Sequence, residues 1–338
     1  MLKSLPVALS DVMKAYHRIS ESIHQTPVFT SAFFDTQMGR GRKFFFKAEN
    51  MQKTGSFKAR GALNAVKCLK ESNPGVEGVI THSSGNHGQA LAWAAQLCGL
   101  KCCVVVPNNA SDVKKSAIEA YGADLIMCEP TPADRENTCN RVAKERNLSI
   151  VPPYDHYDVI AGQGTIAVEF LQQVPDLDAI LVPVSGGGMT AGIAIAAKTI
   201  KPEIKVFMVE PEGKMAEKCL KAGERLWPNP PRFLNTIADG IRLQQLGHLT
   251  WPIILQLVEK EVFSVTDNSI IEGMKFSFEK MKLVIEASSG AAVAAAMSEK
   301  MKSMDAGIKT VGVILCGGNV DIDHLPWYNQ QSKDHTNK

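Results

Sequence analysis

The sequence lacks any hydrophobic run long enough to cross a bilayer. A membrane-spanning helix needs about 20 consecutive apolar residues, and the chain contains no such stretch. Its first residues, MLKSLPVALSDVMK, include too short an apolar segment and no small-residue cleavage site, so no signal peptide is expected. We therefore expect a cytoplasmic protein with no membrane partner.

An excess of charge of either sign is also lacking. Lys and Arg together number 37 and Asp and Glu 35, which gives a formal net charge of +2. This balance provides no electrostatic reason to expect nucleic acid or an anionic membrane surface as a partner. The composition is that of an ordinary globular protein.

Paired cysteine motifs are lacking as well. None of the eight cysteines forms a CxxC pair, which argues against both a zinc site and a disulfide scaffold. His82 and His87 have no further ligands at a spacing that suits zinc. Reduced, mostly buried thiols agree with the expected cytoplasmic location.

The sequence does contain a regular alternation of short β-branched runs and helical patterns. Strands are predicted at Lys43–Phe46, Gly78–Thr81, Cys102–Val106, Asp124–Cys128, Asp178–Val184, Lys205–Val209 and Thr310–Leu315. Helices are predicted at Asp11–His24, Ser111–Tyr121, Arg135–Arg146 and Ile271–Met281. This alternation is typical of an α/β protein with mainly parallel sheets.

Two segments that contain proline divide the chain. Asn73-Pro74-Gly75 and Pro152-Pro153 bracket a block of alternating strands and helices. A chain of 338 residues is also long enough for more than one hydrophobic core. We expect residues 76–155 to form a small mobile domain, and residues 1–75 and 156–338 to form a large one.

Three glycine turns follow predicted strands, at residues 82–87, 185–188 and 316–319. In open parallel sheets, ligands bind beyond the carboxyl ends of the strands. The three consecutive glycines of the second turn let backbone N–H groups surround an oxyanion at the start of a helix, which predicts a phosphate site. A flexible turn is the alternative there, and helix capping explains the first turn equally well.

Lys58 lies in the segment KTGSFKARGA, at the start of a predicted helix. A lysine acts as a nucleophile or base only when neutral, which requires burial or a neighbouring cation. The positive end of the helix dipole disfavours the ammonium form, and Arg60 adds to this effect. Taken alone, however, such a position is more typical of a surface lysine.

Together these segments resemble the fold-type II family of enzymes that use pyridoxal 5'-phosphate (PLP). The matching segments are residues 53–62, 83–87, 161–165, 185–188, 236–240 and 316–319. The most similar branch contains serine racemase, aspartate racemase and serine/threonine dehydratase. The resemblance implies a fold like that of the tryptophan synthase β chain, with two open, mainly parallel sheets flanked by helices.

The resemblance also implies which residues hold PLP. Lys58 would bind the cofactor covalently, and Phe57 would pack beside its ring. Asn86 would donate a hydrogen bond to the ring hydroxyl, and Cys316 would lie next to the pyridine nitrogen. The phosphate would be held by Ser185, Gly186, Gly187, Gly188 and Met189, and Gly240 would lie near the cofactor.

The activity implied is amino-acid racemisation with β-elimination as a side reaction. Lys58 would remove the Cα proton, and Ser84 would supply a proton on the opposite face. The substrate carboxylate would be held by Ser83, Ser84, Asn86 and His87.

The side chain of the substrate is the harder question. Aspartate brings a second carboxylate that must be paired, whereas serine needs only a hydroxyl partner. Related serine racemases carry a serine where this chain has Leu243, and Arg135, His156 and Arg242 are candidate cations. We expect aspartate as the preferred substrate and serine next, although the run of serines that animal aspartate racemases often carry near residues 155–157 is absent. Serine racemase or L-serine/L-threonine dehydratase is the alternative.

Effector sites follow from the same resemblance. The residues matching an ATP site between subunits are Ser31, Lys53, Thr54, Gln89, Tyr121, Lys282 and Asn319. They imply an adenine nucleotide, ATP or AMP, as effector and a homodimer as the assembly. Glu210 would be a ligand of Mg²⁺ or Ca²⁺, but the second carboxylate expected six residues later is Ala216.

Two other functions fit single features of the chain. Residues 162–167 match GxGxxA, but no clear strand precedes them and no strand ending in an acidic residue follows at the spacing of a nicotinamide-binding site. A non-catalytic nucleotide-binding regulator is the second alternative, since a fold alone does not prove activity. The presence of Lys58 and of all three glycine turns argues against it.

Overall fold

Two β-sheets organise the chain, and the computed structural model describes residues 5–83, 85–110 and 112–328. The strands of the larger sheet are β1 (Val28–Thr30), β2 (Lys43–Lys47), β7 (Ala179–Pro183), β8 (Lys205–Pro211), β9 (Phe263–Val265) and β10 (Thr310–Ile314). Their order is β1-β2-β10-β7-β8-β9, and β1 runs antiparallel to β2. The strands of the smaller sheet are β3 (Gly78–His82), β4 (Lys101–Pro107), β5 (Asp124–Cys128) and β6 (Ser149–Ile150). They are parallel, in the order β5-β4-β3-β6.

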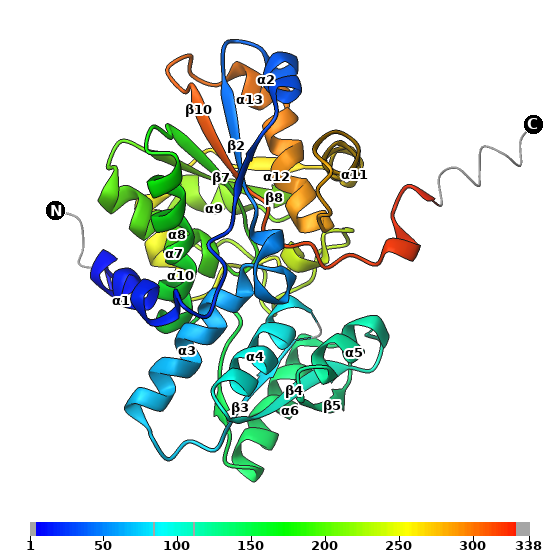
Figure 1. The fold of residues 1–338 in the computed structure, drawn as a ribbon. Helices are drawn as coiled ribbons and strands as arrows, with labels where there is room; N and C mark the ends of the chain where they lie inside the picture. Colours follow the sequence, from blue (N-terminus) through cyan, green and yellow to red (C-terminus); the bar gives the residue numbers. More distant parts are fainter. Residues whose placement is uncertain (1–4, 84, 111, 329–338) are drawn as a thin grey trace, which may run out of the picture.

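Helices flank both sheets (Figure 1). They are α1 (Leu9–Ile19), α2 (Ala32–Met38), α3 (Lys58–Ser72), α4 (Asn86–Leu97), α5 (Asp112–Glu119), α6 (Pro132–Glu145), α7 (Tyr157–Gln173), α8 (Gly188–Ile200), α9 (Ala216–Ala222), α10 (Thr250–Leu257), α11 (Asp267–Phe276), α12 (Ala287–Met297) and α13 (Glu299–Ser303). Short helical turns are η1 (Glu49–Met51), η2 (Lys53–Gly55), η3 (Asp239–Ile241), η4 (Ser277–Met281) and η5 (Ile322–His324). Within the described ranges, no helix has the length and apolar character that crossing a membrane requires.

The predicted α/β architecture is confirmed. Every predicted strand is present, with its ends shifted by no more than two residues. Strand β7 is buried along its whole length, which explains why it reads as a continuous apolar run. The prediction missed β1, β6 and β9, which lie at sheet edges and are too short to show a period.

The helix predictions were less accurate at their ends. The helix predicted from residue 11 to 24 begins earlier, where Asp11 accepts a hydrogen bond from the Ala8 N–H, and ends at Ile19. Helix α6 begins three residues early, because the Thr131 side chain caps it and Pro132 occupies its first position. The segment predicted as a helix over 271–281 is the end of α11 followed by a π-helical turn.

All four strands of the smaller sheet come from residues 78–150. With α4, α5 and α6 they form the lower part of Figure 1, while the larger sheet lies above. These strands fall inside the block 76–155 that was expected as a small domain. The division into domains at those boundaries, and the mobility of the block, remain predictions.

Helices α3, α7 and α8 pack closely against one another. A Cβ atom at Gly192 in α8 would lie 2.3 Å from the carbonyl oxygen of Ile160 in α7. A Cβ atom at Gly61 in α3 would lie 2.3 Å from the Gln163 side chain. Only glycine permits approaches this close, so these positions set the spacing of the three helices.

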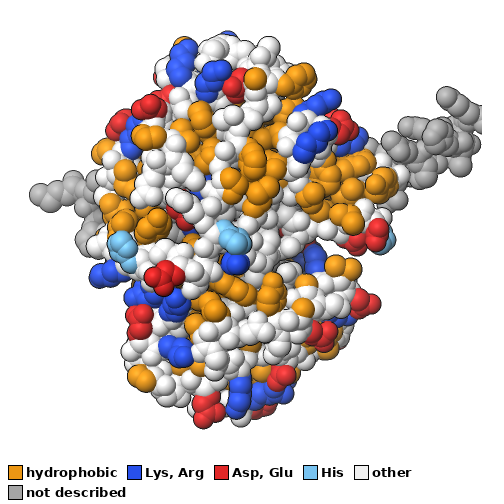
Figure 2. Space-filling model, viewed as in Figure 1, with side chains coloured by type: hydrophobic (Ala, Val, Ile, Leu, Met, Phe, Trp, Pro, Cys, Tyr) orange, Lys and Arg blue, Asp and Glu red, His pale blue; other side chains and the backbone are white. Residues whose placement is uncertain are grey.

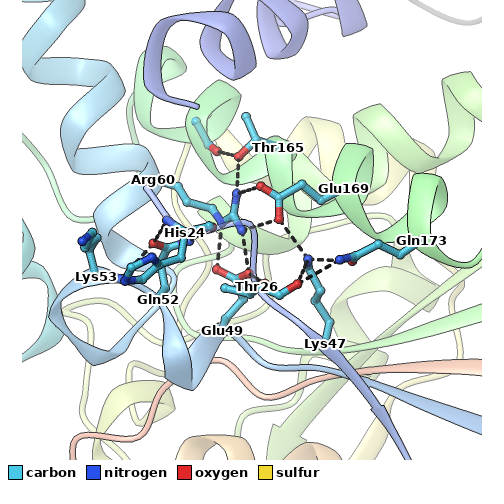
Figure 3. Close-up of polar contacts among 11 residues, drawn as sticks. His24, Thr26, Lys47, Glu49, Gln52, Lys53, Arg60, Thr165, Glu169 and Gln173 are labelled. Atoms are coloured by element: carbon cyan, nitrogen blue, oxygen red, sulfur yellow. Dashed lines mark hydrogen bonds and ion pairs between the residues drawn. The ribbon is translucent and has the colours of Figure 1, made fainter. Parts of the chain in front are cut away.

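A buried ionic network ties α3 to α7 and to the strand β2 (Figure 3). The Arg60 guanidinium donates to Glu49 at 2.8 Å and to Glu169 at 2.7 Å, and the Lys47 ammonium donates to Glu169 at 2.9 Å. All four side chains are at most 3% exposed. Two cations and two carboxylates cancel in charge. Because Arg60 lies two residues after Lys58, the network fixes the start of α3.

We expect the substitution Arg60→Met to lower the free energy of unfolding by about 3–5 kcal/mol, because it leaves two buried carboxylates with a single cation. Urea denaturation measures this loss. Arg141→Met is the control, since Arg141 forms an exposed pair with Glu145 and its loss should cost about 0.5 kcal/mol or less. Equal effects of the two substitutions would contradict the assigned role of the network.

Candidate active site

Lys58 is the first residue of α3, and its side chain is half-buried. Its Nζ donates to the carbonyl oxygen of Pro153 at 2.5 Å and lies 5.1 Å from the centroid of the Phe57 ring. Burial lowers the pKa of Lys58 to about 8, although the nearby Cys316 and Glu286 side chains act in the opposite direction. About a tenth of such amines are neutral at pH 7, so Lys58 can act as a nucleophile or a base.

The glycine turn at residues 185–188 joins β7 to α8. Gly187 has a φ of +94°, in the left-handed region, and a Cβ atom at Gly186 would lie 2.3 Å from the Tyr154 ring. The first N–H groups of a helix have no partner within it. The Thr190 hydroxyl is also buried with no hydrogen-bond partner among the described residues. Together these donors form a cradle that suits a phosphate.

Residues 153 and 154 connect Lys58 to this cradle. Pro153 accepts the hydrogen bond from Lys58, and the next residue, Tyr154, places its ring against Gly186. The Met189 side chain is 5% exposed and packs into the hydrophobic core, so only its backbone is available to a ligand. Figure 2 shows the surface hollowed between the parts of the molecule built on the two sheets.

The turn at 316–319 pairs with the segment that precedes α3. The Phe57 N–H donates to the Cys316 carbonyl at 3.1 Å, and the Gly318 N–H donates to the Gly55 carbonyl at 2.9 Å. Burial raises the pKa of the Cys316 thiol well above its usual range, so this thiol is neutral. Its Sγ lies 3.5 Å from the Ser289 hydroxyl. Sequence reasoning missed Ser289, which lies on α12 and follows no strand.

Asn86 and Gly240 meet at the buried carboxyl group of Glu286. The Asn86 Nδ2 lies 3.0 Å from each carboxyl oxygen, and a Cβ atom at Gly240 would lie 3.3 Å from Oε1 of Glu286. Burial raises the pKa of Glu286 to about 7, and the hydrogen bond from Asn86 opposes this shift. Sequence reasoning missed Glu286 too. Its only signal is an acidic residue directly before an apolar helix.

The predicted carboxylate-binding turn follows β3. The Ser83 N–H donates to the Val105 carbonyl at 3.1 Å, which holds this residue at the carboxyl end of the sheet. The Ser83 hydroxyl lies 3.4 Å from the Gly85 N–H. Ser84, the predicted proton donor, lies outside the described residues.

The two histidines of the predicted substrate set are not free cations. His87 is 2% exposed, its Nε2 lies 3.0 Å from the Val151 carbonyl, and burial lowers its pKa to about 3. It is therefore neutral and can offer a hydrogen bond but no charge. The Nδ1 of His156 lies 3.9 Å from the Asp158 carboxylate, so any positive charge on His156 already has a neighbouring anion.

Arg135 and Arg242 lie together on the ring of Phe233. Their guanidinium carbons are 5.8 Å and 4.7 Å from the ring centroid. Neither forms an ion pair with any residue that the structure describes, and the Arg135 Nε is buried without a hydrogen-bond partner. Burial lowers the pKa of Arg135, and the charge of Arg242 lowers it further. Burial lowers the pKa of His82, beside the carboxylate-binding turn, and the charge of Arg135 lowers it further.

Part of the predicted nucleotide set lies next to the cofactor residues. The Asn319 Nδ2 donates to the Thr54 carbonyl at 2.8 Å and to the Asn86 Oδ1 at 2.9 Å. Lys53 and Thr54 form η2, which contacts α4, the helix that carries Gln89.

The remaining members of the nucleotide set make separate contacts. The Ser31 hydroxyl accepts a hydrogen bond from Phe34 and caps α2. Tyr121 packs against the core of the smaller sheet. The Lys282 ammonium donates to the Glu279 carbonyl at 2.5 Å.

The surroundings of Glu210 do not fit a divalent cation. Its Oε2 accepts a hydrogen bond from the Ala216 N–H at 3.0 Å, and residue 216 offers a methyl group where a second carboxylate was expected. Lys214, on the same turn, is also buried, and its side chain donates to the Leu243 carbonyl. No group of three or more His, Cys, Asp or Glu side chains in the described ranges could hold a metal ion. The expected site for Mg²⁺ or Ca²⁺ is therefore not formed at Glu210.

The other predicted cofactor does fit its surroundings. A half-buried amine of lowered pKa suits the aldehyde of PLP, and the glycine cradle, with its unpaired donors, suits the phosphate. The neutral Cys316 thiol, whose pKa is influenced by the nearby Lys58, would lie beside the PLP ring. These residues would hold the cofactor.

Comparison with known proteins agrees with this geometry. The model of the family described as "Pyridoxal-phosphate dependent enzyme" matches residues 19–317. Human serine racemase is 46% identical over 336 residues, with 97% of this chain and 96% of that protein covered.

Two solved structures are similar along nearly their whole length. The crystal structure of a pyridoxal 5'-phosphate-dependent aspartate racemase is 60% identical, with a TM-score of 0.95 and coverage of 96% of this chain and 99% of that one. Maize serine racemase is 37% identical, with a TM-score of 0.89 and coverage of 98% and 99%. The chain therefore belongs to the pyridoxal-phosphate-dependent enzymes, in the fold-type II branch that contains the serine and aspartate racemases and the related dehydratases.

Proposed function

We propose that this chain is a PLP-dependent racemase of a small amino acid, with β-elimination as a side activity. The observation that carries the proposal is the amine of Lys58, whose pKa burial lowers to about 8, next to a glycine cradle with unpaired donors. The similarity to racemases acting on serine and on aspartate supports it.

In this mechanism the residues of the chain move protons on the two faces of the substrate. Bound PLP withdraws electrons from the Cα atom of the amino acid and so acidifies its Cα–H bond. The neutral amine of Lys58 accepts the Cα proton on one face, and we assign the return of a proton on the other face to the hydroxyl of Ser84. When no proton returns and the substrate has a β-leaving group, that group departs instead.

We propose aspartate as the preferred substrate, with serine next. Arg135 and Arg242 supply two guanidinium groups that have no carboxylate partner in the part of the chain that the structure describes, and a second substrate carboxylate would pair them. Leu243, beside Arg242, offers no polar group to a substrate hydroxyl. The aspartate racemase of known structure is also more similar in sequence than the two serine racemases above. A serine racemase or L-serine/L-threonine dehydratase is the alternative.

We also propose an adenine nucleotide, ATP or AMP, as an effector. The Asn319 side chain supports this, because it hydrogen-bonds both to Thr54 of the predicted nucleotide set and to Asn86 of the predicted cofactor set. A ligand that orders Thr54 would thus act on Asn86 through one side chain.

A homodimer is the proposed assembly. Phe33, Val284 and Ile322 are 60%, 50% and 63% exposed, more than such large apolar side chains usually are. Figure 2 shows hydrophobic side chains gathered over the part of the molecule built on the larger sheet. Exposed apolar surface of this kind favours contact with another protein surface, and a second copy is the partner we propose.

The proposed location is the cytoplasm, where the eight free cysteines would stay reduced.

For substrate choice, we expect L-aspartate to be converted to its D form with a higher kcat/KM than L-serine in a chiral assay. Arg242→Gln should lower kcat/KM for aspartate by about 30–100-fold, since a charge-assisted hydrogen bond contributes about 2–3 kcal/mol, and should change that for serine much less. Arg232→Gln is the control, because Arg232 is exposed on a neighbouring segment. Faster turnover of L-serine would overturn the preference for aspartate.

For the cofactor, we expect the purified protein to show a visible absorption band that Lys58→Ala abolishes and Lys70→Ala, on the same helix, retains. Only the neutral amine reacts with an aldehyde. Because burial lowers the pKa of Lys58 to about 8, the rate at which apoprotein forms the band should rise with pH and level off above pH 8. An ordinary lysine would level off only above about pH 10.4. A band that persists in Lys58→Ala would refute the assignment.

For the second proton, we expect Ser84→Ala to lose at least about 100-fold of the racemisation rate, the usual contribution of general acid catalysis. Elimination from L-serine, measured as pyruvate, should fall much less, because it needs no proton on that face of Cα. Elimination in the same variant serves as the control for correct folding. If both activities fall equally, Ser84 is not the proton donor.

A further inference from the structure

The side chain of Asp155 joins the segment that contacts Lys58 to the start of α10. Pro153, two residues before Asp155, accepts the hydrogen bond from the Lys58 amine. The Asp155 carboxylate accepts the backbone N–H groups of residues 248–250 at 2.8, 2.9 and 3.1 Å. N–H groups at the start of a helix have no partner within it, and the helix dipole favours an anion there. The carboxylate therefore holds two separate segments of the chain together.

The turn that Asp155 holds also binds the glycine cradle. The Gly247 N–H donates to the Gly186 carbonyl at 2.9 Å, and the buried Thr250 hydroxyl donates to the same oxygen at 2.7 Å. Because a peptide group is planar and trans, its C=O and its N–H point in opposite directions. Two hydrogen bonds to the Gly186 carbonyl thus direct the Gly187 N–H away from the turn. The orientation of this N–H group depends on residues 247–250.

The contacts between these segments leave almost no room for movement. A Cβ atom at Gly247 would lie 2.2 Å from the Asp155 carboxylate, and one at Gly187 would lie 2.9 Å from the Thr250 hydroxyl. Only glycine permits approaches this close. Because closely packed groups transmit strain, a shift of the turn would displace the cradle as well.

A carboxylate in this part of the chain could instead act on the substrate directly. Pro153 contacts Lys58, so the segment lies beside the amine that accepts the Cα proton in the proposed mechanism. However, both carboxylate oxygens of Asp155 accept backbone hydrogen bonds from the start of α10. These bonds assign the residue a positioning role.

We propose that Asp155 is a positioning residue for the phosphate of the cofactor. Its carboxylate fixes the turn at residues 247–250, and the turn orients the peptide group between Gly186 and Gly187. The inference rests on the proposed function, in which the cradle at residues 185–188 holds the phosphate of PLP.

The test compares PLP with pyridoxal, which has a hydroxyl in place of the phosphate ester. Both aldehydes bind the Lys58 amine of the apoprotein, so the ratio of the Kd for pyridoxal to the Kd for PLP reports on the phosphate site alone. We expect Asp155→Ala to lower this ratio by at least about tenfold, and Asp155→Asn to lower it less, since asparagine keeps one acceptor oxygen. An unchanged ratio in both variants would overturn the inference.

Asp178→Ala is the matched control. The Asp178 carboxylate also accepts two backbone N–H groups, those of Lys309 and Thr310, at 2.7 and 2.8 Å. Asp178 precedes β7, whereas the cradle follows the other end of that strand. We expect Asp178→Ala to change the ratio by less than about twofold, even where it lowers the melting temperature as much as Asp155→Ala. An equal fall in the ratio would show a general effect of lost stability and would refute the positioning role.

A second variant tests the connection between the turn and the cradle. Thr250→Val keeps the shape of the side chain but removes its hydrogen bond to Gly186, and we expect the ratio to fall about three- to tenfold. The double variant with Asp155→Ala should lose less than the product of the two single effects, because both act through the same turn. Thr250→Val decides the question if Asp155→Ala fails to fold.

The parent protein separates the inference from the proposed function. If the parent binds pyridoxal as tightly as PLP, the proposed phosphate site is wrong and the inference is lost with it. If the parent strongly prefers PLP and both Asp155→Ala and Thr250→Val keep that preference, only the role of Asp155 is refuted.

Discussion

The burial of charge is the constraint on which this structure depends. Arg60, Lys47, Glu49 and Glu169 hold four full charges almost without solvent, which a protein tolerates only when every charge is paired. Their hydrogen bonds join β2, η1 and α3, which are close in sequence, to α7, whose Glu169 lies 109 residues after Arg60. The position of Lys58 is a consequence, because it begins the helix whose third residue is Arg60.

The same desolvation that demands pairing in the network prepares the chemistry in the site. Lys58 has no carboxylate within hydrogen-bond distance among the described residues. The effect of burial therefore prevails and lowers its pKa. Burial likewise raises the pKa values of Cys316 and Glu286. The region around the proposed cofactor thus combines a largely neutral thiol with an amine that is neutral often enough to react. Arg60 and Lys58 are two residues apart, but Arg60 is paired with two carboxylates whereas Lys58 donates only to a carbonyl oxygen.

The features predicted correctly are those that depend on residues close together in the sequence. The long strands and the three turns after them were found because apolar runs and glycines are visible without knowledge of partners. Glu286 and Ser289 were missed because they lie at the start of α12 and are brought to the site only by tertiary packing. The ionic network was equally hidden, since Arg60 and Glu169 are 109 residues apart. The divalent-ion site was expected from Glu210 alone, and the residues that packing brings around it do not complete a site.

Paired and unpaired cations therefore have different meanings in this protein. The charge of Arg60 is paired with two carboxylates of the chain and serves stability. Arg135 and Arg242 share one aromatic ring, carry like charges and have no described carboxylate partner, an arrangement that costs free energy while it lasts. An anion brought by the substrate removes that cost, whereas a hydroxyl does not. Selectivity for a second carboxylate would then come as much from relief of this repulsion as from new hydrogen bonds.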